Sequence, residues 1–191
     1  MTLTQILFFL PAAALVAASP GANNLLAFSN GARAGLKAAA FGLTGRCLAF
    51  ALMIGMVIVG LGALLEASEL AFQIIKWVGV AYLAWLGFKM IRDSAGPAPT
   101  DSSPAASGPG LARREFVVAM TNPKAVLLFT AFVPQFIVSG SGASFTTQLI
   151  VLGGLYIAIE FVAALGWALA GAIIRALRPS AHRMMMVNRV S

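Results

Sequence analysis

The sequence SPGANN at residues 19–24 interrupts an apolar run that extends from Leu3 to Phe28. Such a run is long enough to cross a bilayer, for which about 20 apolar residues are needed. Pro20 removes a backbone donor and clashes with the preceding helical turn, whereas Gly21 lets the chain change direction. The backbone groups freed by the break need partners, so the break must face protein or a water-filled cavity.

A second break of the same kind, TNPK, occurs at residues 121–124. Paired interruptions are typical of carriers that bind their substrate at half-helix ends. Such ends offer backbone N–H groups and carbonyls to a zwitterion, and the nearby amides add neutral donors and acceptors. The alternative is that both breaks are packing kinks whose amides bond a neighbouring helix. On the first interpretation, the substrate-binding residues are Pro20, Gly21, Asn23, Asn24, Asn122, Pro123 and Lys124.

The composition predicts an all-α polytopic membrane protein. Hydrophobic residues make up 60% of the 191 residues and charged residues 10%, against about 45–50% and about 25% in soluble domains. The net charge of +7 is therefore attributed to cytoplasmic loops in contact with the bilayer surface, and not to nucleic-acid binding. Cys47 and His182 are the only cysteine and histidine. Metal sites, cofactors and an enzyme's nucleophile–base pair are accordingly not expected.

Five apolar segments are expected, at about residues 3–28, 38–65, 70–91, 115–138 and 148–177. Residues 1–92 would form a first half of three helices, and residues 113–191 a second half. The Pro-, Ser-, Ala- and Gly-rich residues 93–112 predict a flexible linker between them. In the second segment the small residues Ala38, Gly42, Gly45 and Ala49 share one face, which predicts a close helix contact.

The basic residues indicate the orientation. Ten of the thirteen lysines and arginines fall in or beside residues 29–37, the linker and the C-terminal tail. By the positive-inside rule these regions are cytoplasmic and the N-terminus is external. Both breaks would then lie in the cytoplasmic half of the bilayer, about 17 residues into the first segment and about 7 into the fourth.

Four ionisable residues lie inside the predicted spans, where each costs about 2.5–3.5 kcal/mol and so needs a partner or a cavity. Glu160, taken as the only deep acid, is the candidate for proton coupling; the alternative is a structural pair with Arg46 or Lys76. Lys124 would either bind a substrate carboxylate or snorkel to the cytoplasmic interface. Snorkelling is the favoured interpretation of Lys76.

The chain resembles the lysine exporter (LysE/RhtB) family of amino-acid exporters. The resemblance rests on the proline–glycine–asparagine break in the first segment, on NPKA at residues 122–125 and on PQF at residues 134–136. It also rests on a third-segment pattern of Lys76, Gly79, Ala81, Tyr82, Leu83 and Gly87. The resemblance implies two three-helix halves in the bacterial inner (plasma) membrane. It also implies proton-coupled export of amino acids or their derivatives.

Two departures from the family pattern bear on function. Ala22 stands where the family usually has a second proline, and the chain stops at Ser191, where a sixth helix would begin. The leading hypothesis is a secondary transporter that works by alternating access. The alternative is a truncated or non-transporting membrane subunit of the same fold. A neighbouring copy in a homo-oligomer would be one way to cover the missing helix.

Overall fold

The computed structural model describes residues 1–67, 108–138 and 140–177, with single helical positions at 70, 74, 77, 81, 85 and 88. Every regular element in these residues is helical, which confirms the all-α prediction. The elements are α1 (Leu3–Ala18), α2 (Ala22–Ala34), α3 (Leu36–Ala67), α5 (Gly108–Thr121), α6 (Pro123–Leu127), a π-helical turn η1 (Leu128–Phe132), a 3-10 turn η2 (Val133–Phe136) and α7 (Phe145–Leu177).

Four of the five predicted spans fall in this described part. Helices α3 and α7 are each long and apolar enough to cross a membrane. Two bent helix pairs are also long and apolar enough to cross a membrane as broken spans: α1 with α2, bent by 58°, and α5 with residues 123–136, bent by 62°. The two predicted interruptions are therefore confirmed. The third predicted segment, with Lys76, lies outside the described residues except for the single positions, as do the linker up to residue 107 and the tail.

The predicted loop at residues 29–37 is wrong. Helix α2 continues through Ala34, α3 starts at Leu36, and only Gly35 lies between them. Gly35 has a φ of 86°, a left-handed conformation that glycine adopts without steric cost. Within this stretch Asn30 is buried and donates to Glu115, whereas Arg33 and Lys37 are exposed.

Helix α5 begins earlier than we predicted. It starts at Gly108, so residues 108–112 are helical and are not part of a linker. The break in the fourth span consequently follows 14 helical residues, and not about seven. Both breaks therefore lie nearer the middle of their spans than the sequence suggested. Glu115, expected at the start of a helix, lies two turns inside one.

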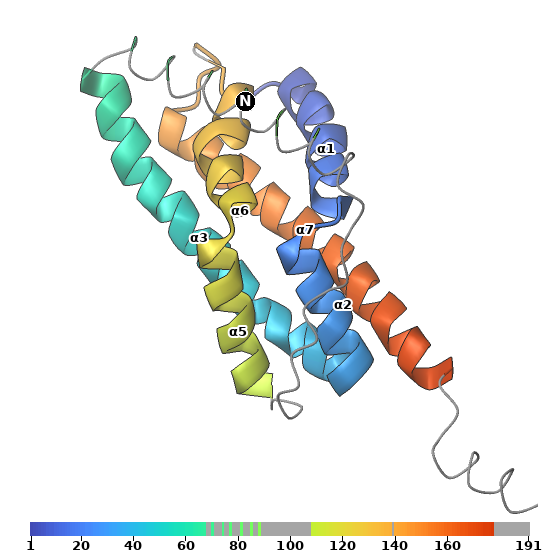
Figure 1. Ribbon diagram of the computed structural model, residues 1–191. Helices are drawn as coiled ribbons and strands as arrows, with labels where there is room; N and C mark the ends of the chain where they lie inside the picture. Colours follow the sequence, from blue (N-terminus) through green and yellow to red (C-terminus); the bar gives the residue numbers. More distant parts are fainter. Residues whose placement is uncertain are drawn as a thin grey trace, which may run out of the picture.

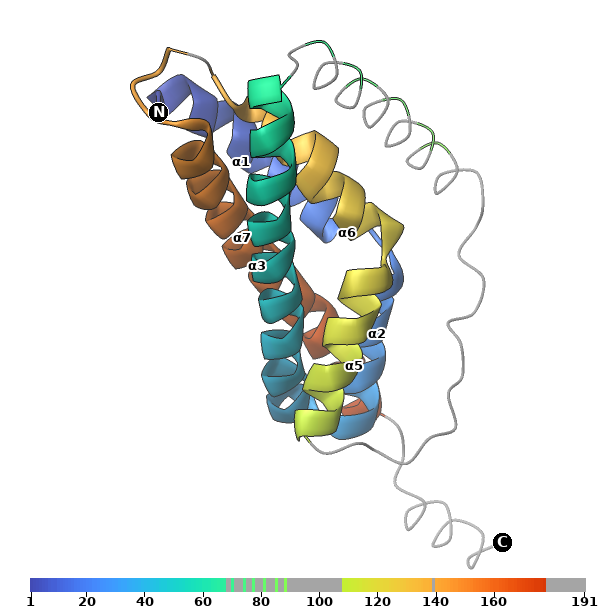
Figure 2. The same cartoon turned by 90° about the vertical axis from the view of Figure 1, so that its left-hand side faces the viewer.

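The ends of the helices alternate between two ends of the bundle (Figures 1 and 2). The N-terminus, the end of α3 and the start of α7 lie at one end, which we call the N-terminal end. The α2–α3 turn, the start of α5 and the end of α7 lie at the other, which we call the Gly35 end. The basic residues of the described helices, other than those inside the bundle, belong to segments at the Gly35 end: Arg33, Lys37, Arg113, Arg114 and Arg175.

Small residues allow the helices to approach closely. A Cβ atom on Gly45 would lie 1.9 Å from the Ala112 carbonyl oxygen of α5. A Cβ atom on Gly31 would lie 1.9 Å from the Ala168 carbonyl oxygen of α7. Gly45 belongs to the stripe predicted from the sequence, and its contact with α5 is confirmed. Close packing of this kind stabilises helix association in lipid, where the hydrophobic effect does not hold helices together.

We predict that Gly45→Ala destabilises the protein by about 1–3 kcal/mol, the usual cost of overpacking, because the new methyl group overlaps a backbone carbonyl. Gly55→Ala on the same helix is the matched control, since nothing lies within 4 Å of its Cβ position. Thermal unfolding of the purified variants in detergent measures the difference. Equal melting temperatures would contradict the close contact between α3 and α5.

Candidate functional site

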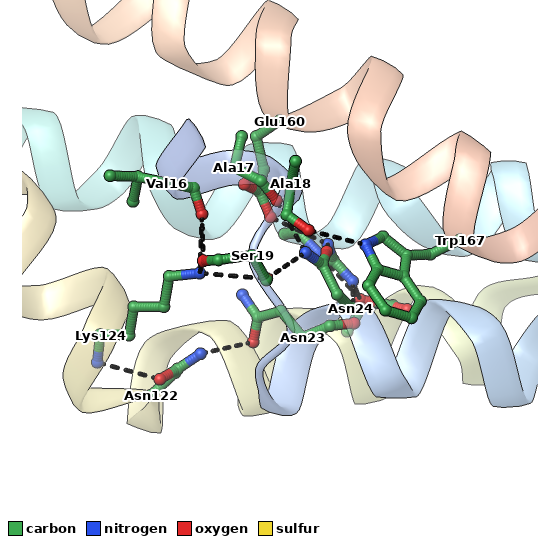
Figure 3. A network of polar contacts seen from close by, with 12 residues as sticks. Val16, Ala17, Ala18, Ser19, Asn23, Asn24, Asn122, Lys124, Glu160 and Trp167 are labelled. Carbon is green, nitrogen blue, oxygen red and sulfur yellow. Dashed lines mark hydrogen bonds and ion pairs between the residues drawn. The ribbon is translucent and has the colours of Figure 1, made fainter. Parts of the chain in front are cut away.

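The break between α1 and α2 exposes the last carbonyls of α1 in the middle of the bundle, and side chains satisfy them. Lys124 Nζ donates to the Val16 oxygen at 2.8 Å, Asn24 Nδ2 to the Ala17 oxygen at 2.7 Å, and Trp167 Nε1 to the Ala18 oxygen at 3.3 Å (Figure 3). The donors come from α6, α2 and α7. Carbonyls that a continuous helix would bond internally thus bond to three other elements.

Lys124 binds the C-terminal end of α1, a position that neither sequence interpretation foresaw. Besides Val16, its ammonium donates to Ser19 Oγ at 2.6 Å and approaches the Ser19 carbonyl oxygen at 3.4 Å. A cation is favourable there, because a helix carries partial negative charge at its C-terminus. No local pattern in the sequence predicts this contact, since Lys124 and Ser19 lie 105 positions apart.

The second break is joined to the first by an amide pair. Asn122 accepts a hydrogen bond from the Lys124 backbone N–H at 3.0 Å and so caps α6. Its Nδ2 donates to Asn23 Oδ1 at 3.0 Å (Figure 3). The predicted meeting of two broken spans is therefore observed. The helix α2, in contrast, has Gly21 as its N-cap residue and so has no side-chain cap.

An arginine with two carboxylate partners lies beside the breaks. Arg46 Nη2 is 2.7 Å from Glu115 Oε2, and Arg46 Nη1 is 3.1 Å from Glu160 Oε1. The guanidinium also donates to Asn24 Oδ1 at 3.2 Å and to the Asn23 carbonyl. All three charged residues are at most 5% exposed. A buried guanidinium is tolerable here because each of its three nitrogens donates to a partner.

Glu115 corrects the prediction that Glu160 is the only deep acid. Its second oxygen accepts from Asn30 Nδ2 at 2.9 Å, so both of its oxygens are bonded. Sequence analysis missed it because the start of α5 was placed too late. Because the helix starts seven residues earlier, at Gly108, Glu115 lies inside the bundle.

A small polar cavity lies between the breaks. Its lining comprises Gly21, Asn23, Asn24, Phe50, Asn122, Lys124, Ala125, Tyr156 and Glu160. Its volume is about 10 Å³, room for about one water molecule. Tyr156, which the sequence analysis did not select, donates to Glu160 Oε2 at 3.0 Å. Glu160 therefore faces the cavity, whereas Glu115 does not line it.

Most of the predicted substrate residues gather at this cavity, but the two prolines do not. Gly21, Asn23, Asn24, Asn122 and Lys124 all line it. Pro20 and Pro123 are exposed and are absent from the lining. Their contribution is to the backbone, because they prevent continuous helices at the two breaks.

A larger cavity of about 260 Å³ lies between α3, α5, α6 and η1. It is lined mainly by methionines and other apolar residues, with Thr130 as the polar exception. Such a lining offers no partner to a charged ligand. The small polar cavity is therefore the better candidate for a polar or zwitterionic substrate.

Polar contacts close the bundle on both sides of the polar cavity. Toward the N-terminal end, Gln5 of α1 donates to the Phe136 oxygen at 2.6 Å and to Gln148 Oε1 at 2.7 Å. Toward the Gly35 end, Arg46, Glu115 and Asn30 join α3, α5 and α2. These contacts join the helices on both sides of the cavity. Among the described residues, no group of three His, Cys, Asp or Glu side chains could hold a metal ion.

Comparison with known proteins identifies the family. The sequence profile of the LysE type translocators matches residues 14–191. The chain belongs to the LysE type translocator family. It is a membrane transporter and not an enzyme, because members of this family are transporters.

Three relatives illustrate the similarity. An uncharacterized membrane protein of Vibrio cholerae serotype O1 is 34% identical over 96% of this chain and 89% of its own length. A homoserine/homoserine lactone efflux protein of Salmonella typhi is 30% identical over 99% of this chain and 91% of its own length. A leucine efflux protein of Enterobacter sp. strain 638 is 30% identical over 66% of this chain and 62% of its own length. No solved structure matches the chain.

We predict that Arg46→Gln destabilises the protein by about 3–5 kcal/mol, the cost of breaking a buried ion pair, because it leaves two buried carboxylates without their cation. Arg33→Gln is the matched control, since Arg33 is exposed at the end of α2, and should change stability by less than about 0.5 kcal/mol. Thermal unfolding in detergent separates the two. A melting temperature of Arg46→Gln equal to that of Arg33→Gln would refute the stabilising role of the cluster.

Proposed function

We propose that this transporter exports amino acids or close derivatives from the cytoplasm by alternating access, driven by the proton gradient. The observation that carries the proposal is the small polar cavity between two broken spans, which Glu160 lines. The relatives named for efflux of homoserine, homoserine lactone and leucine support this substrate class. The positive-inside rule supports a cytoplasmic Gly35 end and an external N-terminus in the bacterial inner membrane.

The two half-helix ends suit the two charges of an amino acid. The N–H groups at the start of α2 have no side-chain cap, and this end carries partial positive charge for a carboxyl group. The carbonyls at the end of α1 suit an ammonium group. Asn23 and Asn122 add amide groups on the same wall of the cavity. The amides thus bond each other across the breaks and also face the proposed substrate.

The two closures support alternating access. A cavity of about 10 Å³ is too small for an amino acid, so the bundle opens to load and to release. Separation of α1 and η2 from α7 at Gln5 and Gln148 would open the N-terminal end. Separation of α2 and α3 from α5 at Glu115 would open the Gly35 end. Each closure is a small set of hydrogen bonds between helices, and such contacts are compatible with rigid-body rocking.

Proton coupling is assigned to Glu160. Arg46 has two carboxylates, and Glu115 remains its partner when Glu160 takes up a proton. Protonation of Glu160 therefore does not leave a buried guanidinium without a counter-ion, the situation that is strongly unfavourable. Glu160 lines the cavity and can respond to substrate, whereas Glu115 does not line it. Glu160 can thus pair with Arg46 and also act in proton coupling.

The test is efflux of radiolabelled homoserine from proteoliposomes with an imposed pH gradient. Glu160→Gln should lower gradient-driven efflux at least about tenfold, the effect of about 1.4 kcal/mol, while gradient-free exchange of homoserine persists. Glu66→Gln is the matched control, because it lies on α3 about 30 Å from Arg46.

Two outcomes count against the proposal. Gradient-driven efflux by Glu160→Gln at the wild-type rate would remove Glu160 from coupling. No efflux or exchange of homoserine or leucine by the wild-type chain would contradict amino-acid export and favour a non-transporting subunit.

A further inference from the structure

The contact between Lys124 and α1 has the form of a ligand bound in a site. The Lys124 ammonium meets three oxygens: Val16 O at 2.8 Å, Ser19 Oγ at 2.6 Å and Ser19 O at 3.4 Å. The Lys124 side chain also passes beside Gly21, where a Cβ atom would be 3.7 Å from its Cδ and 3.9 Å from its Nζ. Two of the acceptors are main-chain carbonyls that the helix break sets free.

We propose that this set of oxygens is the ammonium subsite of the transported substrate, and that Lys124 is an internal occupant which the substrate displaces. The proposal rests on the proposed function, since it assigns one half of the substrate to one half-helix end. A lysine side chain ends in the same –NH3⁺ group, with three donors and one charge, that an amino acid carries on its α-carbon. The oxygens that hold the one group can therefore hold the other.

Displacement also accounts for the room that a substrate needs. The cavity that Lys124 lines has a volume of only about 10 Å³. The polar groups around it are bonded to one another, and Ser141 Oγ is the single buried side-chain polar atom without a partner in the described residues. A substrate therefore enters by exchanging partners with the protein. Lys124 is suited to leave because its flexible stem lets the ammonium reach other acceptors.

The released Lys124 ammonium has a new partner in the substrate itself. An α-amino acid brings carboxyl oxygens close to its own ammonium, so one exchange replaces the oxygens that Lys124 loses. An ester carbonyl oxygen can also accept this hydrogen bond, although it binds less strongly than a carboxylate. The site would thus require an ammonium group on the substrate and would accept an ester in place of the carboxylate. The substrate class is a small molecule with an ammonium group on the carbon next to a carbonyl carbon.

The name of one relative agrees with this class. The homoserine/homoserine lactone efflux protein is named for two compounds that share the α-ammonium group. The lactone has an ester where homoserine has a carboxylate. A site built on carboxylate recognition would separate these two compounds, whereas a site built on ammonium recognition would not.

Lys124 could bind the substrate carboxylate directly, or the substrate ammonium could displace it. These two roles predict opposite changes in substrate affinity when Lys124 is replaced by methionine. The full chain in lipid nanodiscs is titrated calorimetrically at about pH 6, where an α-amino group is protonated. The probes are homoserine, homoserine lactone and 2,4-dihydroxybutanoate, which has the carboxylate but no ammonium. The variant is Lys124→Met, which keeps the length of the side chain. The control is Lys37→Met, because Lys37 is exposed on the first turn of α3.

We expect Lys124→Met to bind homoserine lactone about tenfold more tightly than the wild type, because no internal ammonium competes for the subsite. Homoserine should gain less, because it loses the Lys124 contact to its carboxylate. Dihydroxybutanoate should bind neither protein measurably, and Lys37→Met should match the wild type. If Lys124→Met does not fold, Lys124→Gln replaces it. This variant should also bind homoserine lactone more tightly than the wild type, but by a smaller factor.

Weaker binding of the lactone to both Lys124 variants would overturn the proposal, as would dihydroxybutanoate binding as tightly as homoserine. If wild-type efflux of homoserine is intact while these results are obtained, the displacement idea alone fails. If the wild type neither binds nor exports homoserine, the proposed function fails and the displacement idea with it.

Discussion

Two broken spans in a membrane oblige the bundle to find partners for every backbone group that the breaks release, since hydrocarbon supplies none. The structure meets this requirement with side chains from other helices. Lys124, Asn24 and Trp167 bond three consecutive carbonyls at the end of α1. A hydrogen bond from a side chain can be exchanged for one from a small molecule, which a bond inside a helix cannot. In the displacement that we propose, the breaks provide the place where a substrate replaces a protein side chain.

The charged cluster follows from the same requirement. Arg46 donates to the carbonyl of Asn23, next to the first break, and so brings a guanidinium into the bundle. Its charge is balanced by Glu115 and Glu160, which come from the two spans that pack against α3. One acid is enclosed and the other faces the cavity. In the proposed coupling, this asymmetry lets one carboxylate take up a proton while the other keeps the arginine neutralised. Packing and the proposed coupling thus depend on one set of contacts.

Local features of the sequence were enough to predict the breaks, the all-α fold and the close contact at Gly45, because proline, glycine and small-residue periodicity act within a few residues of the chain. Contacts between distant segments were not predictable in the same way. The role of Glu115 depended on where α5 begins, and its start at Gly108, Pro109 and Gly110 carries a weak helix signal. The partner of Lys124 depended on how two spans meet. The Gln5–Gln148 contact, which joins residues 143 positions apart, left no local pattern at all.

The central claim is that the two broken spans meet around a hydrated pocket open to substrate. Thiol labelling tests it most directly: Gly21→Cys and Gly55→Cys are placed in a Cys47→Ser background and treated with a maleimide in membranes. Gly21 lines the cavity and Gly55 is exposed on the apolar surface of α3. A thiol reacts as its thiolate, which requires water. The account predicts that Gly21→Cys is labelled, that homoserine slows this labelling, and that Gly55→Cys stays unreactive. A Gly21→Cys thiol as inert as that of Gly55→Cys, or labelled at a rate that no amino acid alters, would contradict it.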